Sequence, residues 1–226
     1  MVVITVASRK GGSGKSTLTA HLAAYAKKAS RRCLLIDADP QGSLALWHSL
    51  RKSGEPLLRS ATRGVDNLIK AAKDAGLEWV FIDTPPQVSG IVNDAIRAAT
   101  LVVIPARPSV FDIDAVKETI EYARERRKPY AIVLNGAPPK RDTSEAPITA
   151  LARESLDKLK APVWSGQITH RTTYSLALAE GEGAREFDPN SLAATEIARL
   201  FSAIERSVMA ILGKGSATSA MHRRAA

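Results

Sequence analysis

Short apolar runs alternate with longer amphipathic stretches along most of this sequence. The apolar runs, rich in aliphatic and β-branched residues, have the length of strands: Val2–Ala7, Cys33–Asp37, Trp79–Asp83, Leu101–Ile104 and Tyr130–Asn135. Nearly continuous apolar character is typical of parallel strands that are buried on both faces. The amphipathic stretches have the length of helices: Lys15–Ala29, Val65–Ala75, Ile91–Ala99, Ile113–Arg126 and Thr149–Lys160. This alternation predicts an α/β fold, a doubly wound and mostly parallel sheet with helices on both faces.

A long helical pattern follows over Ser191–Leu212. Its apolar residues recur every three or four positions and form one stripe: Ile197, Leu200, Phe201, Ile204, Val208 and Ile211. Such a stripe packs against a sheet or lies on a membrane surface, and we expect packing against the sheet. Residues 213–226 are small, polar and basic. We therefore expect one domain over residues 1–212 and a flexible basic tail after it.

The composition is that of a globular protein with an excess of positive charge. The 226 residues are 45% hydrophobic, and 32 lysines and arginines against 23 acidic residues give a formal net charge of +9. This excess favours polyanionic partners such as nucleic acid or anionic lipid. The single cysteine, Cys33, excludes an internal disulfide framework and a thiolate metal cage. We find neither an apolar stretch of membrane-spanning length nor a secretory signal, so we expect a cytoplasmic protein.

A glycine-rich segment follows the first predicted strand and opens the first predicted helix. It reads Lys10-Gly11-Gly12-Ser13-Gly14-Lys15-Ser16-Thr17. Its glycines allow backbone conformations closed to other residues, so successive N–H groups can form a concave nest at a helix N-terminus. In a phosphate-binding loop of this kind, Lys15 reaches the β- and γ-phosphates and the Ser16 hydroxyl binds Mg²⁺. The segment therefore predicts a nucleotide site built from Lys10 to Thr17.

Carboxylates stand at the ends of two more predicted strands. Asp37 ends the second apolar run and Asp39 follows it, while Asp83 ends the run Trp79-Val80-Phe81-Ile82-Asp83. The carboxyl ends of parallel strands meet at one edge of an open sheet, where ligands bind. A carboxylate at the end of such a strand is placed to hold a water molecule on Mg²⁺. We therefore expect Ser16, Asp37 and Asp83 to form the metal site.

The phosphate loop departs from the general pattern G-x-x-x-x-G-K-[ST] at its first position. Arg9 stands where the first glycine belongs, and an additional lysine, Lys10, follows it. In this the loop resembles the deviant Walker A motif of the ParA/MinD family. The resemblance implies a dimer that holds two ATP molecules between its subunits, with Lys10 reaching the partner's nucleotide. A cation there neutralises charge as the γ-phosphate leaves. The expected catalytic residues are therefore Lys10 and Lys15, together with Asp39, whose role follows from the next motif.

The segment Asp37-Ala38-Asp39-Pro40-Gln41 matches the family's next motif. The resemblance implies that Asp39 orients the attacking water, while Asp37 supports the loop and the metal shell. Thr84-Pro85-Pro86 follows Asp83, without the catalytic glutamate that many ATPases carry there. The absence of a strong base predicts slow hydrolysis, which suits a protein that times a process better than a metabolic enzyme.

The resemblance continues through most of the chain, to about residue 210. The segment Ile104–Ser109 is similar to a proline-containing loop near the dimer interface of short ParA proteins. Asn135 stands where family members hydrogen-bond adenine, although an asparagine that ends a strand is also a common turn former. Residues 168–189 resemble the family's C-terminal segment. The sequence begins directly at the first strand, without a helix-turn-helix before it, which is typical of the short subgroup.

Three functions from different classes fit these motifs. The first is a partition or cargo-positioning ATPase, in which ATP builds the dimer and the dimer binds DNA on the nucleoid without sequence preference. A small partner, a ParB-like protein or a cargo adaptor, then stimulates hydrolysis. The net charge favours this function, because non-specific DNA binding rests on phosphate neutralisation. The candidate DNA contacts are Arg171, Arg199 and Arg206.

The second function is a MinD-like membrane switch. Residues 215–224 contain one bulky apolar side chain, Met221, which offers too little area for stable anchoring, so we expect no stable membrane binding. The third is a metabolic ligase or amidotransferase on the same scaffold. It needs a further substrate site, and the four scattered histidines do not indicate one.

Overall fold

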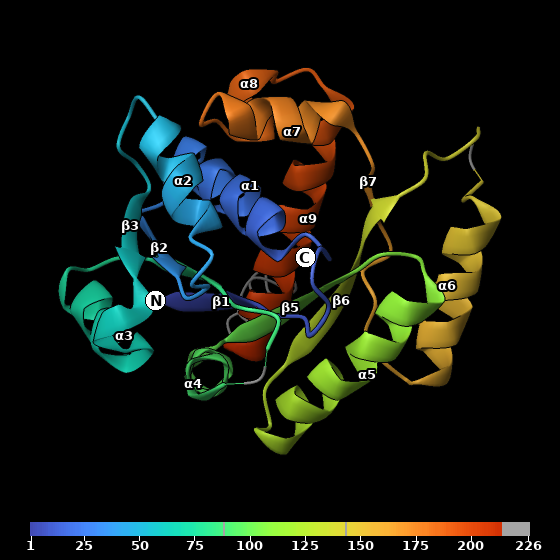
Figure 1. The fold of residues 1–226 in the computed structure, drawn as a ribbon, viewed down its shortest axis with the longest axis horizontal. Helices are drawn as coiled ribbons and strands as arrows, with labels where there is room; N and C mark the ends of the chain where they lie inside the picture. The colour runs from blue at the N-terminus through green and yellow to red at the C-terminus, as the bar shows by residue number, and fades with distance from the viewer. Residues whose placement is uncertain (88, 143, 214–226) are drawn as a thin grey trace, which may run out of the picture.

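A single parallel sheet organises the chain (Figure 1), whose computed structural model describes residues 1–87, 89–142 and 144–213. Its strands are β1 (Val2–Val6), β2 (Cys33–Asp37), β3 (Leu57–Ser60), β4 (Trp79–Asp83), β5 (Leu101–Ala106), β6 (Tyr130–Ala137) and β7 (Ile168–Thr169). Their order is β3-β2-β4-β1-β5-β6-β7, and every neighbouring pair is parallel. All residues of β2, β4 and β5 are buried, as their apolar runs predict. The predicted α/β fold is confirmed.

Helices cover both faces of this sheet (Figure 1). One face carries α1 (Lys15–Lys28), α2 (Ser43–Leu50), α7 (Thr172–Ala179), α8 (Ala184–Phe187) and α9 (Leu192–Ile211). The other face carries α3 (Val65–Asp74), α4 (Gly90–Ala98), α5 (Val110–Glu125) and α6 (Pro147–Lys158), with a short 3₁₀ turn, η1 (Ala61–Arg63), before α3. The doubly wound arrangement is therefore present.

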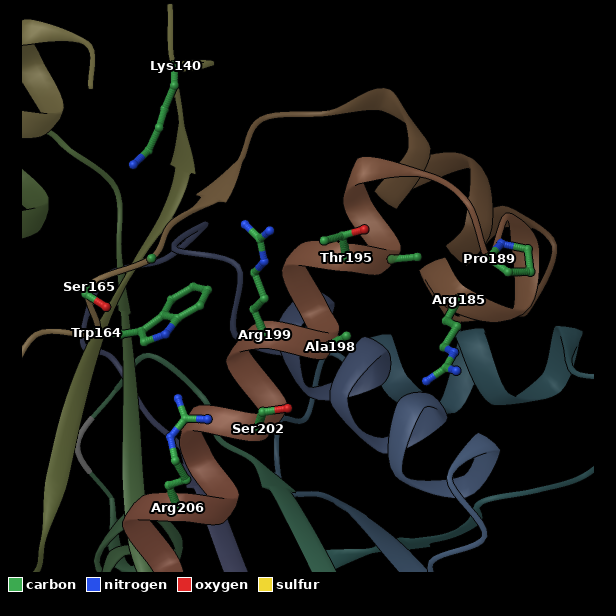
Figure 2. Close-up of a pocket in the computed structure, with 12 residues that line it drawn as sticks. Lys140, Trp164, Ser165, Arg185, Pro189, Thr195, Ala198, Arg199, Ser202 and Arg206 are labelled. Atoms are coloured by element: carbon green, nitrogen blue, oxygen red, sulfur yellow. The ribbon is translucent and has the colours of Figure 1, made fainter. Parts of the chain in front are cut away.

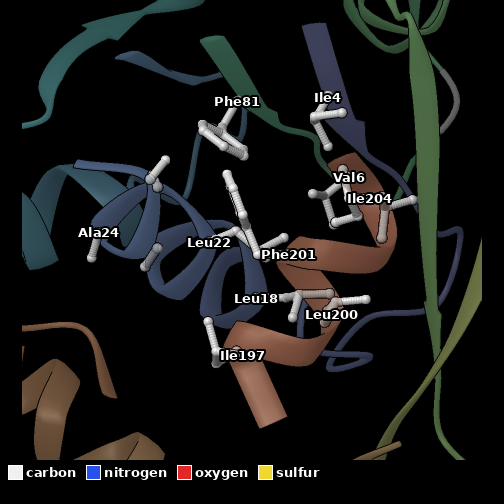
Figure 3. Packing of buried hydrophobic residues seen from close by; sticks show 14 of the residues in the cluster. Ile4, Val6, Leu18, Leu22, Ala24, Phe81, Ile197, Leu200, Phe201 and Ile204 are labelled. Carbon is white, nitrogen blue, oxygen red and sulfur yellow. The ribbon is translucent and has the colours of Figure 1, made fainter. Parts of the chain in front are cut away.

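The largest buried cluster lies between the sheet, α1 and α9 (Figure 3). Leu18 and Leu22 of α1 meet Phe201 of α9 over Ile4 and Phe81 of the central strands (Figure 3). The predicted stripe of α9 packs here from Ile197 to Val208, whereas Ile211 in the last turn is 40% exposed. The predicted tail, residues 213–226, lies outside the described residues apart from Gly213.

Several elements differ from the sequence expectation at their ends. Helix α5 begins at Val110, three residues before the predicted start, because the Ser109 hydroxyl accepts the backbone N–H of Asp112 and caps the first turn. Strand β5 continues to Ala106 and β6 to Ala137. The helices α2, α7 and α8 and the edge strands β3 and β7 were not expected from the pattern of apolar residues. They are short, and most of β3 is exposed.

Candidate nucleotide site and basic groove

The glycine-rich loop connects β1 to α1 at the carboxyl edge of the sheet. Gly12 and Gly14 have φ angles of +73° and +94°, in the left-handed region that favours glycine. A Cβ atom on Gly14 would lie 2.1 Å from Nδ2 of Asn135. That amide group donates a hydrogen bond of 2.7 Å to the carbonyl oxygen of Ser13. The loop is therefore held from the end of β6, and its shape requires glycine at position 14.

The two lysines of the loop lie in different environments. Lys15 is 6% exposed, and its Nζ donates a hydrogen bond of 3.2 Å to the carbonyl oxygen of Lys10. Burial lowers the pKa of Lys15, while the carboxylates of Asp83 and Asp39 act in the opposite direction. Lys10 is partly exposed, and its ammonium group has no hydrogen-bond partner among the described residues. Two cations thus lie at the loop without direct neutralisation by a carboxylate.

Asp83, at the end of β4, is fully buried beside the start of α1. Its Oδ2 accepts a hydrogen bond of 2.5 Å from the Ser16 hydroxyl, while its Oδ1 has no partner among the described residues. Burial raises the pKa of Asp83 to about 7, although the hydrogen bond from Ser16 acts in the opposite direction. An unpartnered buried carboxylate oxygen beside a hydroxyl suits a site that is completed by a cation or its water.

The two other predicted carboxylates lie at the end of β2, in the strand register next to Asp83. Asp37 accepts the backbone N–H groups of Asp39 at 3.2 Å and of Ala45 at 3.0 Å. Burial raises the pKa of Asp37, although these two bonds lower it. Asp39 is partly exposed and accepts the N–H of Gln41 at 3.0 Å. The contacts of Asp37 therefore fix the loop and the start of α2, while Asp39 remains accessible.

A pocket of about 380 Å³ adjoins the loop on the side of β6. Gly14, Thr17 and Asn135 line it together with Arg107, which follows β5. Asn135 precedes Gly136, at φ +64°, where the pairing of β6 with β7 is irregular. Asn135 was predicted as an adenine contact, and one of its N–H groups is already bound to the loop. The segment Ile104–Ser109, which contains Arg107, was expected only as part of a loop near a dimer interface, and the place of Arg107 in this pocket was not predicted.

The three predicted DNA-contacting arginines do not come together. Arg171 lines the pocket beside Asn135, and its guanidinium donates to Oε1 of Glu196 at 2.8 and 3.1 Å. Glu196 also accepts the N–H of Thr169 and the hydroxyl of Tyr174. The charge of Arg171 is therefore balanced by a carboxylate that itself holds the local structure.

Arg199 and Arg206 lie two turns apart on α9 and point into one hollow of about 770 Å³ (Figure 2). Trp164 forms its opposite wall, and Lys140 and Arg185 also line it (Figure 2). We call this hollow the basic groove. Neither Arg199 nor Arg206 has an ion-pair partner within residues 1–87, 89–142 and 144–213. Lys140, Trp164 and Arg185 were missed because they lie far apart in the sequence and converge only in the fold.

The described residues limit what the chain can hold or cross by itself. No group of three or more histidine, cysteine or acidic side chains in that part of the chain could hold a metal ion. The predicted metal residues Ser16, Asp37 and Asp83 would need further ligands, such as the phosphates of a nucleotide, to complete a metal site. In the same part of the chain, none of the helices has the length and apolar character needed to cross a membrane.

Comparison with known families gives a match over most of the chain. The profile of the CobQ/CobB/MinD/ParA nucleotide binding domain matches residues 4–184, which include the phosphate loop, both carboxylate segments and Asn135. Among curated proteins, the chain is 36% identical over 123 residues to the maintenance of carboxysome distribution protein A of Gloeobacter kilaueensis. It is 30% identical over 156 residues to the chromosome-partitioning ATPase Soj of Thermus thermophilus. These matches cover 54% and 55% of this chain, and 56% and 62% of the relatives.

Solved structures show the same fold. A chain of the MinC:MinD cell division protein complex of Aquifex aeolicus matches with a TM-score of 0.74 at 21% identity. The match covers 91% of this chain and 96% of that chain. The Cyanothece McdA(D38A)-ATP complex matches 94% of this chain and 96% of its own with a TM-score of 0.68 at 19% identity.

Proposed function

Because this chain belongs to the CobQ/CobB/MinD/ParA nucleotide-binding family, we propose that it is an ATP-driven dimerising switch that binds DNA and positions DNA or a protein cargo. The observation that carries the proposal is the meeting of Lys15, Ser16 and Asp83 at the phosphate loop, with Ser16 Oγ 2.5 Å from Asp83. The relatives that are named for chromosome partitioning and for carboxysome distribution support positioning as the task.

The loop residues would bind the phosphate chain of ATP. Backbone N–H groups of Gly11 to Lys15 would form the nest at the start of α1, where the helix dipole adds positive charge. The ammonium group of Lys15, which is bonded to a carbonyl oxygen of its own loop, would turn to the β- and γ-phosphates. Asn135 and Thr17 would lie beside the nucleoside in the adjoining pocket.

Ser16 and Asp83 would hold Mg²⁺ with the phosphates, which fits the buried and unpartnered Oδ1 of Asp83. When bound, the ion neutralises charge on the β- and γ-phosphate oxygens. Asp37 would keep the loop of Asp39 in place through the N–H groups of Asp39 and Ala45. Asp39, the accessible carboxylate, would orient the attacking water.

Lys10 would complete the site of a second copy of the chain. Its partly exposed ammonium group is free of hydrogen bonds to the described residues, so it is available to a nucleotide across a dimer interface. The test is size-exclusion chromatography with light scattering, with ATP, with ADP and without nucleotide. The wild-type chain should dimerise only with ATP, and Lys10→Ala should remain monomeric while its unfolding temperature is unchanged. A Lys10→Ala variant that dimerises normally would remove this role.

Hydrolysis would be slow until a small partner protein accelerates it. The segment after Asp83 offers no glutamate as a general base, since Thr84, Pro85 and Pro86 follow it. We expect turnover well below about 10 s⁻¹, the median for enzymes. Steady-state phosphate release from the purified chain measures this rate, and a faster turnover without any partner would contradict a timing role.

The basic groove would contact the phosphates of DNA. Arg199 and Arg206 carry charges that no described carboxylate balances. Arg185 lines the same groove, and so does Lys140, which pairs with Glu145. Arg171 would contribute less, because Glu196 pairs with it. Contacts of this kind bind without sequence preference and weaken steeply as salt increases.

DNA binding is best measured by fluorescence anisotropy over a series of salt concentrations, with ATP and with ADP. Each phosphate contact contributes about 0.9 to the slope of log affinity against log salt. The double variant Arg199→Ala/Arg206→Ala should therefore lower that slope by about two per chain. Arg97→Ala is a matched control on α4, on the other face of the sheet. Equal slopes for the double variant and the control would refute the groove as the DNA site.

A further inference from the structure

Arg107 is a third cation beside the phosphate loop, in addition to Lys10 and Lys15. It follows β5, the neighbour of β1 in the sheet, and therefore leaves the sheet at the same edge as the phosphate loop. Its Nη2 lies 3.7 Å from the place where a Cβ atom on Gly12 would stand. Its Cγ lies 3.9 Å from the corresponding place on Gly136. The side chain of Arg107 therefore extends from Gly136, near the end of β6, to Gly12 of the phosphate loop.

The backbone of Arg107 is held in place by its own turn. Its N–H donates to Oδ1 of Asp112 at 3.3 Å, and its carbonyl oxygen accepts the N–H of Ser109 at 2.8 Å. Pro108 follows it directly, and the residue before a proline is biased towards extended conformations. The side chain therefore starts from a fixed point, which lowers the entropy cost of placing the guanidinium.

The carboxylate of Asp112 does not balance the guanidinium. Its Oδ1 is used by the N–H of Arg107, and its Oδ2 accepts the Ser109 hydroxyl at 2.7 Å. Across the described part of the chain, the guanidinium of Arg107 has neither a hydrogen bond nor an ion pair. It is an exposed group with five N–H donors that lines the pocket of about 380 Å³ beside the loop.

We propose that Arg107 binds the phosphate chain of the nucleotide held by the phosphate loop of its own chain. A guanidinium is suited to this because its planar fork can give two parallel hydrogen bonds to phosphate oxygens. The role differs from that of Lys10, which would serve the nucleotide of the other copy. The inference rests on the proposed function, since it needs a nucleoside di- or triphosphate at the loop.

The test compares ADP and inorganic pyrophosphate as ligands of the purified chain. ADP binding is measured by isothermal titration, and pyrophosphate by its competition with ADP, with Arg107→Ala, Arg107→Lys and the control Arg97→Ala. Loss of charge-assisted hydrogen bonds predicts that Arg107→Ala weakens both ligands by roughly ten- to a hundredfold. Arg107→Lys should lie between it and the wild type, because it keeps the charge and loses the fork. The unfolding temperatures of Arg107→Ala and Arg107→Lys should match that of the wild type, since the guanidinium of Arg107 has no partner among the described residues of the free chain.

Two results would overturn the inference. Arg107→Ala could bind both ligands like the control, which would mean that the guanidinium touches neither. It could also weaken ADP alone, which would place the contact on the nucleoside. Lys15→Ala separates these results from a failure of the proposed function. If the wild type does not bind ADP, or if Lys15→Ala binds it equally well, the nucleotide site itself is wrong.

Discussion

The buried carboxyl group of Asp83 should make the stability of the ligand-free protein fall as pH rises. Its pKa is raised from 3.8 to about 7 by burial, so the folded chain holds a proton that the unfolded chain has released. The contribution of Asp83 to the free energy of unfolding then decreases between about pH 4 and pH 7. At 1.36 kcal/mol per pH unit the whole effect is roughly 4 kcal/mol, of which about 2 kcal/mol lies between pH 5.5 and pH 8.

Replacing Asp83 by asparagine removes this proton equilibrium while it keeps the shape and an acceptor for the Ser16 hydroxyl. We therefore expect Asp83→Asn to gain stability relative to the wild type by about 2 kcal/mol as pH goes from 5.5 to 8. The assay is urea unfolding at a series of pH values, without nucleotide or Mg²⁺. Asp66→Asn, at an exposed carboxylate on α3, is the control.

The wild type must be compared with Asp83→Asn because His21 changes the stability with pH in the opposite direction. Its ring is fully buried and its Nδ1 accepts the N–H of Ala184, and burial lowers its pKa from 6.5 to about 4. The stability that it contributes is present above pH 6.5 and is lost as pH falls towards 4. Both proteins contain His21, so its effect cancels. Parallel pH profiles for the wild type and Asp83→Asn would refute the account of Asp83.

Three further predictions concern the loop, its catalytic carboxylate and the core. Gly14→Ala should lower the unfolding temperature and abolish ADP binding in titrations, because it combines a φ of +94° with a Cβ 2.1 Å from Asn135; normal ADP affinity would contradict the geometry. Asp39→Ala should keep ATP binding and lose about a hundredfold in phosphate release, the lower end of the range of general acid–base effects; unchanged release would remove its role. Phe201→Ala should lower the free energy of unfolding, measured in urea, by about 3–5 kcal/mol, since Phe201 is 2% exposed and its ring centroid lies 5.0 Å from that of Tyr25. A loss under about 1 kcal/mol would show that the core refills the space.

The apolar pattern predicted the strands that are buried on both faces, because only such strands leave a continuous apolar run. Strand β3 has no such run, since it lies at the sheet edge and three of its four residues are exposed. Helix α2 was missed for a related reason. Leu44 and Trp47 are its buried residues, whereas Leu46 and Leu50 are exposed, so its apolar residues do not mark one face.

The phosphate loop and the carboxylates could be predicted because each motif is contiguous in the sequence. Contacts between distant segments could not. Asn135 was expected beside the base, and its amide is bonded to Ser13, 122 positions earlier. The pairing of Arg171 with Glu196 likewise depends on the contact of α9 with β7 in the fold. The basic groove has no local signal at all, since its walls come from separate segments.

Helix α1 extends from the phosphate loop to residues beside the basic groove. It starts at the phosphate loop and, with 14 residues, is about 21 Å long. Near its other end, the ring of Tyr25 lies against Phe201 of α9, and the guanidinium carbon of Arg185 lies 5.1 Å from that ring. Helix α1 therefore connects the phosphate loop to two of the elements that line the basic groove, α8 with Arg185 and α9. A change in the tilt or length of α1 would affect both the phosphate loop and the basic groove, so neither site can be redesigned through α1 without disturbing the other.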